Sequence, residues 1–187
     1  MRLIVLGGTG SGKGTQTAKL CDRLKIPNIA TGDILRASIA SETELGTEAK
    51  AYVEQGELVP DQLMIQLIQQ RLQQPDVSQG WILEGYPRTA FQAEELDFLL
   101  KKIKQTLDWA IYLQVSEATM THRALNRNLA EDNSEVIQRR LQNFRNSTLP
   151  ILEYYEYRQK LLKINGELSP DKVFQQLISQ LQPSSVR

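Results

Sequence analysis

The chain has 187 residues, of which 41% are hydrophobic and 24% charged, a composition typical of one globular α/β domain with a substantial core. Its 22 basic residues balance its 22 acidic ones, so no basic surplus points to nucleic acid or an anionic membrane as a partner. The single cysteine, Cys21, excludes an intrachain disulfide and suits a reducing cytoplasm. No apolar run is long enough to span a bilayer, and we expect no signal or transit segment ahead of the first strand.

Short apolar runs alternate with helical patterns along the chain. The apolar runs predict strands at 2–6, 26–31, 81–84, 109–115 and 161–165. The helical patterns cover 13–24, 33–72 with breaks at Gly46, Gly56 and Pro60, 89–104, 117–127, 134–158 with a kink at Pro150, and 170–181. This alternation predicts a parallel sheet with right-handed crossovers. Ligands bind at the carboxyl ends of such strands, so the residues that follow each strand are candidates for the site.

The stretch "GGTGSGKGTQ" at 7–16 follows the first strand and opens a helix. Its glycines leave backbone N–H groups open to phosphate oxygens, and the helix directs its positive end to the same point. Lys13 supplies a charge for the outer phosphates, and we expect it to be exposed at the helix start. A plain glycine-rich turn is the alternative, but the strand before, the helix after and the lysine in register favour polyphosphate binding.

Gly14 and Thr15 follow Lys13, where the usual phosphate loop has Ser or Thr directly after the lysine. This variant resembles the loop of adenylate kinases and related nucleoside monophosphate (NMP) kinases. The resemblance extends from Arg2 to about Leu181. It implies an α/β P-loop kinase fold, a five-stranded parallel sheet flanked by helices, in a single domain (1–187) with a helical NMP-binding lobe (30–59) and a short lid (127–132). It also implies that ATP is bound by Gly10, Ser11, Gly12, Lys13, Gly14, Thr15, Arg123, Arg127 and Leu168.

Two further motifs follow strands. In "TGDILRA" (31–37), Thr31 and Arg36 can face one site, and the guanidinium suits a phosphate, although a turn with a solvated arginine would look the same. In "EGYPRT" (84–89), a tight turn directs Arg88 back over the strand end. The resemblance makes both motifs parts of an AMP site, with Gln92 at the adenine edge. The implied AMP-binding residues are Thr31, Arg36, Glu57, Leu58, Val59, Gly85, Tyr86, Pro87, Arg88, Gln92 and Arg140.

Basic residues gather on the last third of the chain. Arg123 and Arg127 lie four residues apart on one predicted helix, and Arg139 and Arg140 lie on the next. Solvated basic faces are the alternative to a phosphoryl clamp. The resemblance implies that Lys13, Arg88, Arg123, Arg127 and Arg140 are the catalytic residues, and that a connection this short carries no structural zinc. The single histidine, His122, is expected at the surface without a role as a base.

The chain departs from the family pattern at three positions. Thr9 replaces a proline of the phosphate loop, with a small expected loss of rigidity. Glu84 stands where the family has the Asp that organises Mg²⁺ and its waters, so we expect Glu84 to contact the metal through water. Leu129 replaces an arginine ahead of the acidic pair Glu131-Asp132. The last two departures bear on the turnover rate more than on the fold.

The resemblance implies reversible transfer of the terminal phosphoryl group of MgATP to AMP, giving two ADP, in adenine nucleotide homeostasis and salvage. It further implies a cytoplasmic monomer with Mg²⁺ as cofactor, ATP and AMP as partners, and neither nucleic acid nor membrane. A UMP/CMP kinase is one alternative, although Thr31 favours AMP because pyrimidine kinases tend to carry Ala there. A low-activity or non-catalytic nucleotide-binding paralogue is another, suggested by Glu84 and Leu129.

Overall fold

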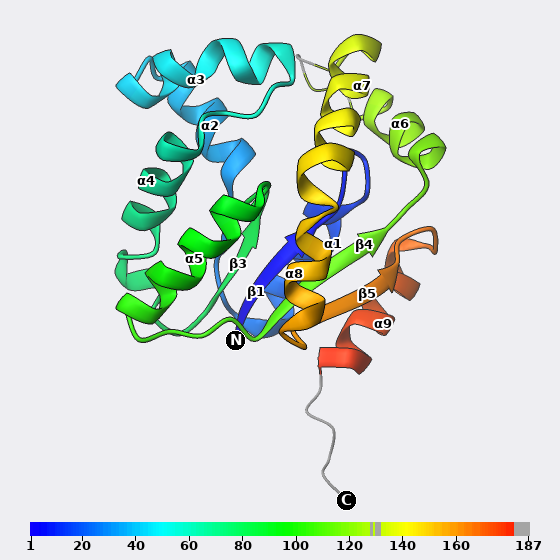
Figure 1. Cartoon of the computed structure of the whole chain (residues 1–187). Helices are drawn as coiled ribbons and strands as arrows, with labels where there is room; N and C mark the ends of the chain where they lie inside the picture. Colours follow the sequence, from blue (N-terminus) through cyan, green and yellow to red (C-terminus); the bar gives the residue numbers. More distant parts are fainter. Residues whose placement is uncertain (128, 130–131, 182–187) are drawn as a thin grey trace, which may run out of the picture.

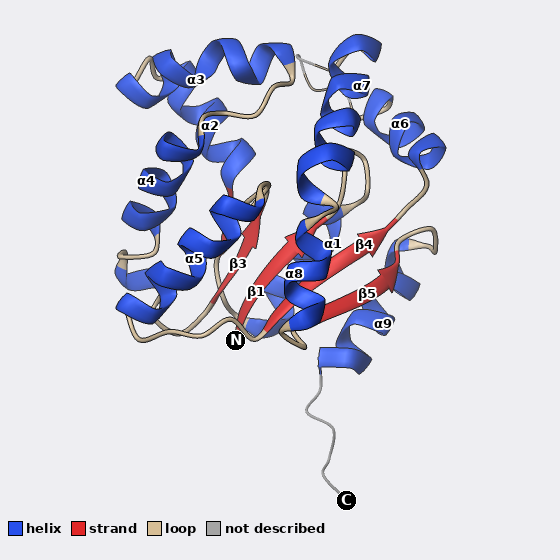
Figure 2. Cartoon of the chain, in the orientation of Figure 1, coloured by secondary structure: helices blue, strands red, loops and turns tan. Residues whose placement is uncertain are grey.

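The computed structural model describes residues 1–127, 129 and 132–181. Five parallel strands form one sheet in the order β2-β3-β1-β4-β5, with helices on both faces (Figures 1 and 2). The strands are β1 (Arg2–Leu6), β2 (Asn28–Ala30), β3 (Trp81–Glu84), β4 (Trp109–Gln114) and β5 (Leu161–Asn165). The predicted parallel α/β fold is therefore confirmed, and only the second and fourth strands are shorter than their apolar runs.

Side chains of the central strands alternate between two hydrophobic clusters. Leu3 and Val5 of β1 pack with α1 (Lys13–Leu24) and α9 (Pro170–Leu181) on one face of the sheet. Ile4 and Leu6 pack into the larger cluster on the other face. That cluster is covered by α4 (Asp61–Arg71), α5 (Ala90–Lys102) and α8 (Ile151–Tyr157). Because both faces are covered, the strands are apolar runs with little polar alternation.

Two pairs of helices stand beyond the carboxyl ends of the strands (Figure 1). On one side are α2 (Thr31–Ala40) and α3 (Glu44–Gln55), and on the other are α6 (Glu117–Leu125) and α7 (Ser134–Asn143). The break predicted at Gly46 is wrong, because this residue lies inside α3 and the chain turns earlier, at 41–43. Gly46 has a packing reason instead: a Cβ there would lie 2.1 Å from the Ser38 carbonyl oxygen of α2.

The helix predicted over 134–158 is divided into three parts. A π-helical turn, Phe144–Thr148, separates α7 from α8, and the Leu149 N–H donates to the Phe144 carbonyl over 2.9 Å. Pro150 lies directly before α8 rather than inside a bent helix. Proline has no N–H to continue the α-helical hydrogen bonds, so the helical turn ahead of it is one residue wider, as in a π-helix.

No helix among the described residues is long and apolar enough to cross a membrane.

Candidate functional site

A cavity of about 780 Å³ opens at the carboxyl ends of β1, β2 and β3. It is bordered by the phosphate loop, by the starts of α2 and α5, and by α6 and α7. It brings together most of the sequence-predicted site residues, namely Gly10, Gly12, Lys13, Gly14, Thr15, Thr31, Arg36, Glu57, Leu58, Val59, Glu84, Gly85, Tyr86, Pro87, Arg88, Gln92, Arg123, Arg127 and Arg140. Ser11 and Leu168 instead line a neighbouring cavity of about 200 Å³, which shares Gly12, Thr15 and Arg123 with the first.

The phosphate loop connects β1 to the start of α1, and its glycines have a steric reason. Gly10 and Gly12 adopt φ values of 76° and 91°, a region that side chains disfavour. A Cβ on Gly10 would also lie 2.1 Å from the carbonyl oxygen of Met120 in α6. The loop therefore packs tightly on α6 while α1 directs its first backbone N–H groups toward the cavity.

Lys13 is held inside the loop, so the expectation that it is exposed was wrong. Its Nζ donates to the carbonyl oxygens of Gly7 and Gly8, each over 2.8 Å. Burial lowers the pKa of Lys13 from 10.5 to about 8; the charges of Arg88 and Arg127 act in the same direction, while Glu84 opposes them. A bound polyphosphate would favour the ammonium form, so the free site is prepared for an anion.

On the second side of the cavity, Thr31 and Gly85 fix how two strand ends meet. Thr31, the first residue of α2, is 1% exposed, and its Oγ1 donates to the Glu84 carbonyl oxygen over 3.2 Å. Gly85 has a φ of 85°, and a Cβ there would lie 2.4 Å from Thr31 Oγ1. Only glycine fits this position, and it lets the chain turn toward Arg88.

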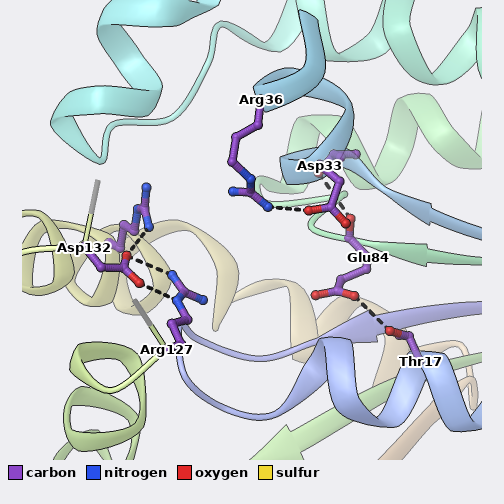
Figure 3. Close-up of polar contacts among 8 residues, drawn as sticks. Thr17, Asp33, Arg36, Glu84, Arg127 and Asp132 are labelled. Carbon is purple, nitrogen blue, oxygen red and sulfur yellow. Dashed lines mark hydrogen bonds and ion pairs between the residues drawn. The ribbon is translucent and has the colours of Figure 1, made fainter. Parts of the chain in front are cut away.

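Arg36 and Arg88 carry the positive charge of this side. Arg36 forms an ion pair with Asp33, three residues earlier in α2 (Figure 3). Arg88 donates from Nε to the Gly85 carbonyl oxygen over 2.9 Å, and its own carbonyl accepts from Thr148 Oγ1 over 3.0 Å. Both guanidinium groups border the cavity, where a phosphate could compete for them.

Gln92 is 2% exposed, and both ends of its amide are already hydrogen bonded. Its Oε1 accepts from the Arg88 N–H over 2.7 Å, and its Nε2 donates to Asp61 Oδ1 over 2.7 Å. The amide keeps one further N–H and one further lone pair for a ligand. Tyr86 is also buried, with its hydroxyl donating to the Gln92 carbonyl; burial raises the pKa of Tyr86, and Asp61 and Glu95 add to the effect.

The segment predicted to line an adenine ring lies between α3 and α4 and is held against α7. Asn143 of α7 donates to the Gly56 carbonyl oxygen over 3.1 Å and to Glu57 over 3.2 Å. Arg139 forms an ion pair with Glu57 at 3.4 Å. Leu58 and Val59 border the cavity beside them. Arg139 thus serves a contact between elements rather than the solvated face that was its alternative.

The lid-side arginines converge on one carboxylate. Asp132, whose side chain is 1% exposed, pairs with both Arg127 and Arg140, the latter at 2.9 Å (Figure 3). Arg123 donates to the Gly166 carbonyl oxygen after β5 over 3.0 Å. Leu129 also borders the cavity. Glu131, the other member of the predicted acidic pair, lies outside the described residues.

Glu84 ends β3 beneath the start of α1. Its Oε2 accepts from Thr17 Oγ1 over 3.0 Å (Figure 3). Among the described residues, no three His, Cys, Asp or Glu side chains gather as a metal site. A single carboxylate beside a phosphate loop nevertheless fits Mg²⁺, which is commonly held by one or two carboxylates, substrate phosphates and water.

Sequence reasoning missed the residues that hold the predicted ones in place: Thr17, Asp33 and Asp61. Two of them carry a local signal. Thr17 lies four residues after Lys13, and Asp33 three before Arg36, so each pair shares a helix face. Asp61 carries no such signal, because it reaches Gln92 from another helix.

Comparisons with known proteins identify the family of this chain. The sequence model of the family described as adenylate kinase matches residues 5–160. The chain is 56% identical to adenylate kinase 2 of Nostoc sp. (strain PCC 7120), over 97% of this chain and 98% of that protein. It is 55% identical to adenylate kinase 2 of Synechocystis sp. (strain PCC 6803), over 97% and 100%. Adenylate kinase of Xanthomonas campestris pv. campestris (strain B100) is 44% identical, over 95% and 97%. The chain belongs to the adenylate kinase family.

Proposed function

We infer that this enzyme transfers the terminal phosphoryl group of MgATP reversibly to AMP and forms two ADP. One observation carries this inference: a single cavity is bordered by a phosphate loop on one side and by the Thr31, Arg36 and Arg88 group on the other. A nucleotide-hydrolysing enzyme needs only the first of these. Two anion-binding sides that face each other suit transfer between two nucleotides.

We assign the donor to the phosphate loop. Lys13 and the backbone N–H groups of 10–15 would bind the ATP phosphates, with Arg123 and Arg127 beside those phosphates and the Leu168 backbone at the adenine. Lys13 must then leave the Gly7 and Gly8 carbonyls for the phosphates. The Lys13 side chain is long and flexible, so we expect its Nζ to exchange these two hydrogen bonds for phosphate contacts without movement of α1.

We assign the acceptor to the opposite side. Arg36 and Arg88 would bind the AMP phosphate, and 57–59 together with Gln92 would enclose its base. Arg140, Arg127 and Arg123 approach from α6 and α7 and would offset the charge of the transferring group. The acceptor phosphate is already ionised at neutral pH, so the reaction needs no base from the protein.

When bound with ATP, Mg²⁺ would supply positive charge that offsets the charge developing on the phosphates. Glu84 would contact the Mg²⁺ through a water molecule. It is the last residue of β3 and borders the cavity together with the phosphate loop. The position of the metal-bound water would then depend on how rigidly neighbouring residues orient the Glu84 carboxylate.

We propose that 30–59 and 127–132 act as the AMP lobe and the lid, and that both close over the substrates to exclude water. Arg36 on the lobe and Arg127 at the start of the lid each pair with a carboxylate that a phosphate would displace. We also propose that the enzyme works as a cytoplasmic monomer: the residues of one chain are enough to form both anion-binding sides of the cavity, and its single cysteine, Cys21, suits a reducing compartment.

The test is ADP formation from MgATP with AMP, UMP and CMP in turn. We expect AMP to be used at least about 10-fold more efficiently than either pyrimidine nucleotide. The reason is that Gln92 is assigned to the edge of the adenine ring and that Thr31 stands where pyrimidine kinases tend to carry Ala. A preference for UMP or CMP would overturn the acceptor assignment. Binding of both nucleotides without ADP formation would mark the chain as a non-catalytic paralogue.

A further inference from the structure

We propose that Thr17 is a positioning residue: its hydroxyl holds the Glu84 carboxylate in the orientation that serves the metal of the bound nucleotide. The inference rests on the proposed function, because it assigns that metal to MgATP. It concerns a side chain outside the phosphate loop and behind the carboxylate, so Thr17 itself does not border the cavity.

The first observation is the contact. Thr17 Oγ1 lies 3.0 Å from Glu84 Oε2 and 3.1 Å from the Gly14 carbonyl oxygen. A hydroxyl has one hydrogen, and the charged carboxylate is the stronger acceptor of the two. Figure 3 shows the Thr17 hydroxyl and one Glu84 oxygen directed toward each other. The second oxygen, Oε1, faces the first turn of α1 and would lie 3.9 Å from a Cβ on Gly14. Thr17 therefore fixes one oxygen and leaves the other for the site.

The second observation is how rigidly the donor is held. Thr17 is 0% exposed on α1, which packs on the sheet beside α9, so its hydroxyl has one fixed location relative to the loop. Thr17 also lies one helical turn after Lys13, whose charge interacts with Glu84. The same helix thus places the phosphate-binding lysine and the group that orients the acidic residue.

The third observation is the length of the side chain. Glu84 has three rotatable bonds, and its partly exposed carboxylate would lose rotational freedom whenever it organised metal-bound water. The bond from Thr17 removes part of that freedom before the nucleotide arrives. An aspartate at this position would end about 1.5 Å earlier, one methylene short of Thr17. The longer Glu84 side chain therefore reaches the Thr17 hydroxyl, and the hydrogen bond from that hydroxyl restricts the rotation of the longer side chain.

The test measures nucleotide affinity by calorimetry, with ATP plus Mg²⁺ and with ATP plus a chelator, so it has a readout other than turnover. We expect Thr17→Val, which keeps the shape and removes the donor, to weaken MgATP binding by about 3- to 10-fold and to leave metal-free ATP binding within about 2-fold. Thr17→Ser, which keeps the hydroxyl, is the matched control and should stay within about 2-fold of the parent for both ligands. Circular dichroism melting of each variant checks the fold.

A double-variant cycle distinguishes positioning from packing. In a Glu84→Asp background the carboxylate no longer reaches Thr17, so Thr17→Val should change MgATP affinity by less than about 2-fold. The proposal is overturned if Thr17→Val weakens ATP and MgATP equally, if it weakens neither, or if its full effect persists in the Glu84→Asp background. Absence of ADP formation by the parent enzyme would instead contradict the proposed function, and that outcome is read in a separate assay.

Discussion

Replacing Lys13 with methionine should have opposite effects on stability and on phosphoryl transfer. The ammonium is partly buried and lies near Arg88 and Arg127, and burial together with these charges lowers the pKa of Lys13 from 10.5 to about 8. The free protein therefore tolerates an unfavourable charge that only a bound polyphosphate would offset. Methionine keeps the aliphatic stem and removes the charge.

The magnitude follows from the pKa. A fall from 10.5 to about 8 corresponds to about 3 kcal/mol against the charged form in the folded state. Loss of the two bonds from Nζ to the Gly7 and Gly8 carbonyls offsets part of this, so at pH 7 we expect Lys13→Met to be more stable by about 1–2 kcal/mol. Between pH 8 and 10.5 the unfolded chain binds a proton at Lys13 that the folded chain does not. Parent stability from this group thus rises with pH, and the advantage of the variant shrinks.

Urea unfolding of both proteins at pH 7, 8, 9 and 9.5 measures this difference. Lys19→Met is the matched control, because Lys19 lies on the same helix in an exposed pair with Asp171, and its effect should stay within about 1 kcal/mol at every pH. Transfer to AMP by Lys13→Met should fall at least about 100-fold at pH 7. A stability difference that does not change with pH, or near-normal turnover, would refute the reasoning.

Three further predictions concern the two sides of the cavity. Arg36→Ala and Arg88→Ala should each weaken use of AMP by about 10- to 150-fold while ATP binding, followed by calorimetry, changes little; equal loss for both nucleotides would contradict the two-sided layout. Glu84→Gln should cut turnover across a Mg²⁺ titration and Glu84→Asp should retain most of it, whereas parent-like behaviour of Glu84→Gln would leave the residue a partner of Thr17 alone. Leu129→Arg should raise turnover, because it places a further cation at the lid side of the cavity. The gain in transition-state stabilisation should be smaller than the ~3 kcal/mol of an optimised contact. A lower melting temperature together with a lower rate would show that Leu129 is a packing residue.

Local patterns were sufficient to predict the strands and the phosphate loop. Each strand is a short apolar run because both sheet faces are covered, and the loop is recognisable because its glycines and Lys13 have fixed spacing between a strand and a helix. The kink expected at Pro150 is instead a π-helical turn over Phe144–Thr148, because the missing N–H of the proline acts on the turn ahead of it and a π-helical turn has no sequence period of its own.

Side-chain partners were harder to predict, because they depend on contacts between distant segments. Asp61 holds Gln92 across 31 positions, and Thr17 meets Glu84 across 67. The burial of Lys13 likewise follows from how the loop folds over its ammonium group and not from its place at the start of a helix. The candidate residues could therefore be identified from the sequence. Their protonation and the hydrogen bonds that hold their side chains became visible only in the three-dimensional structure.

The destination of the phosphoryl group is the central claim, and following a label tests it most directly. ATP carrying radioactive phosphorus in its terminal group is incubated with the enzyme, Mg²⁺ and unlabelled AMP, and the products are separated by chromatography after short intervals. The account predicts that the label appears first in the β-phosphate of ADP, in step with the loss of AMP. Label released as inorganic phosphate, or ADP formed at the same rate without AMP, would contradict it.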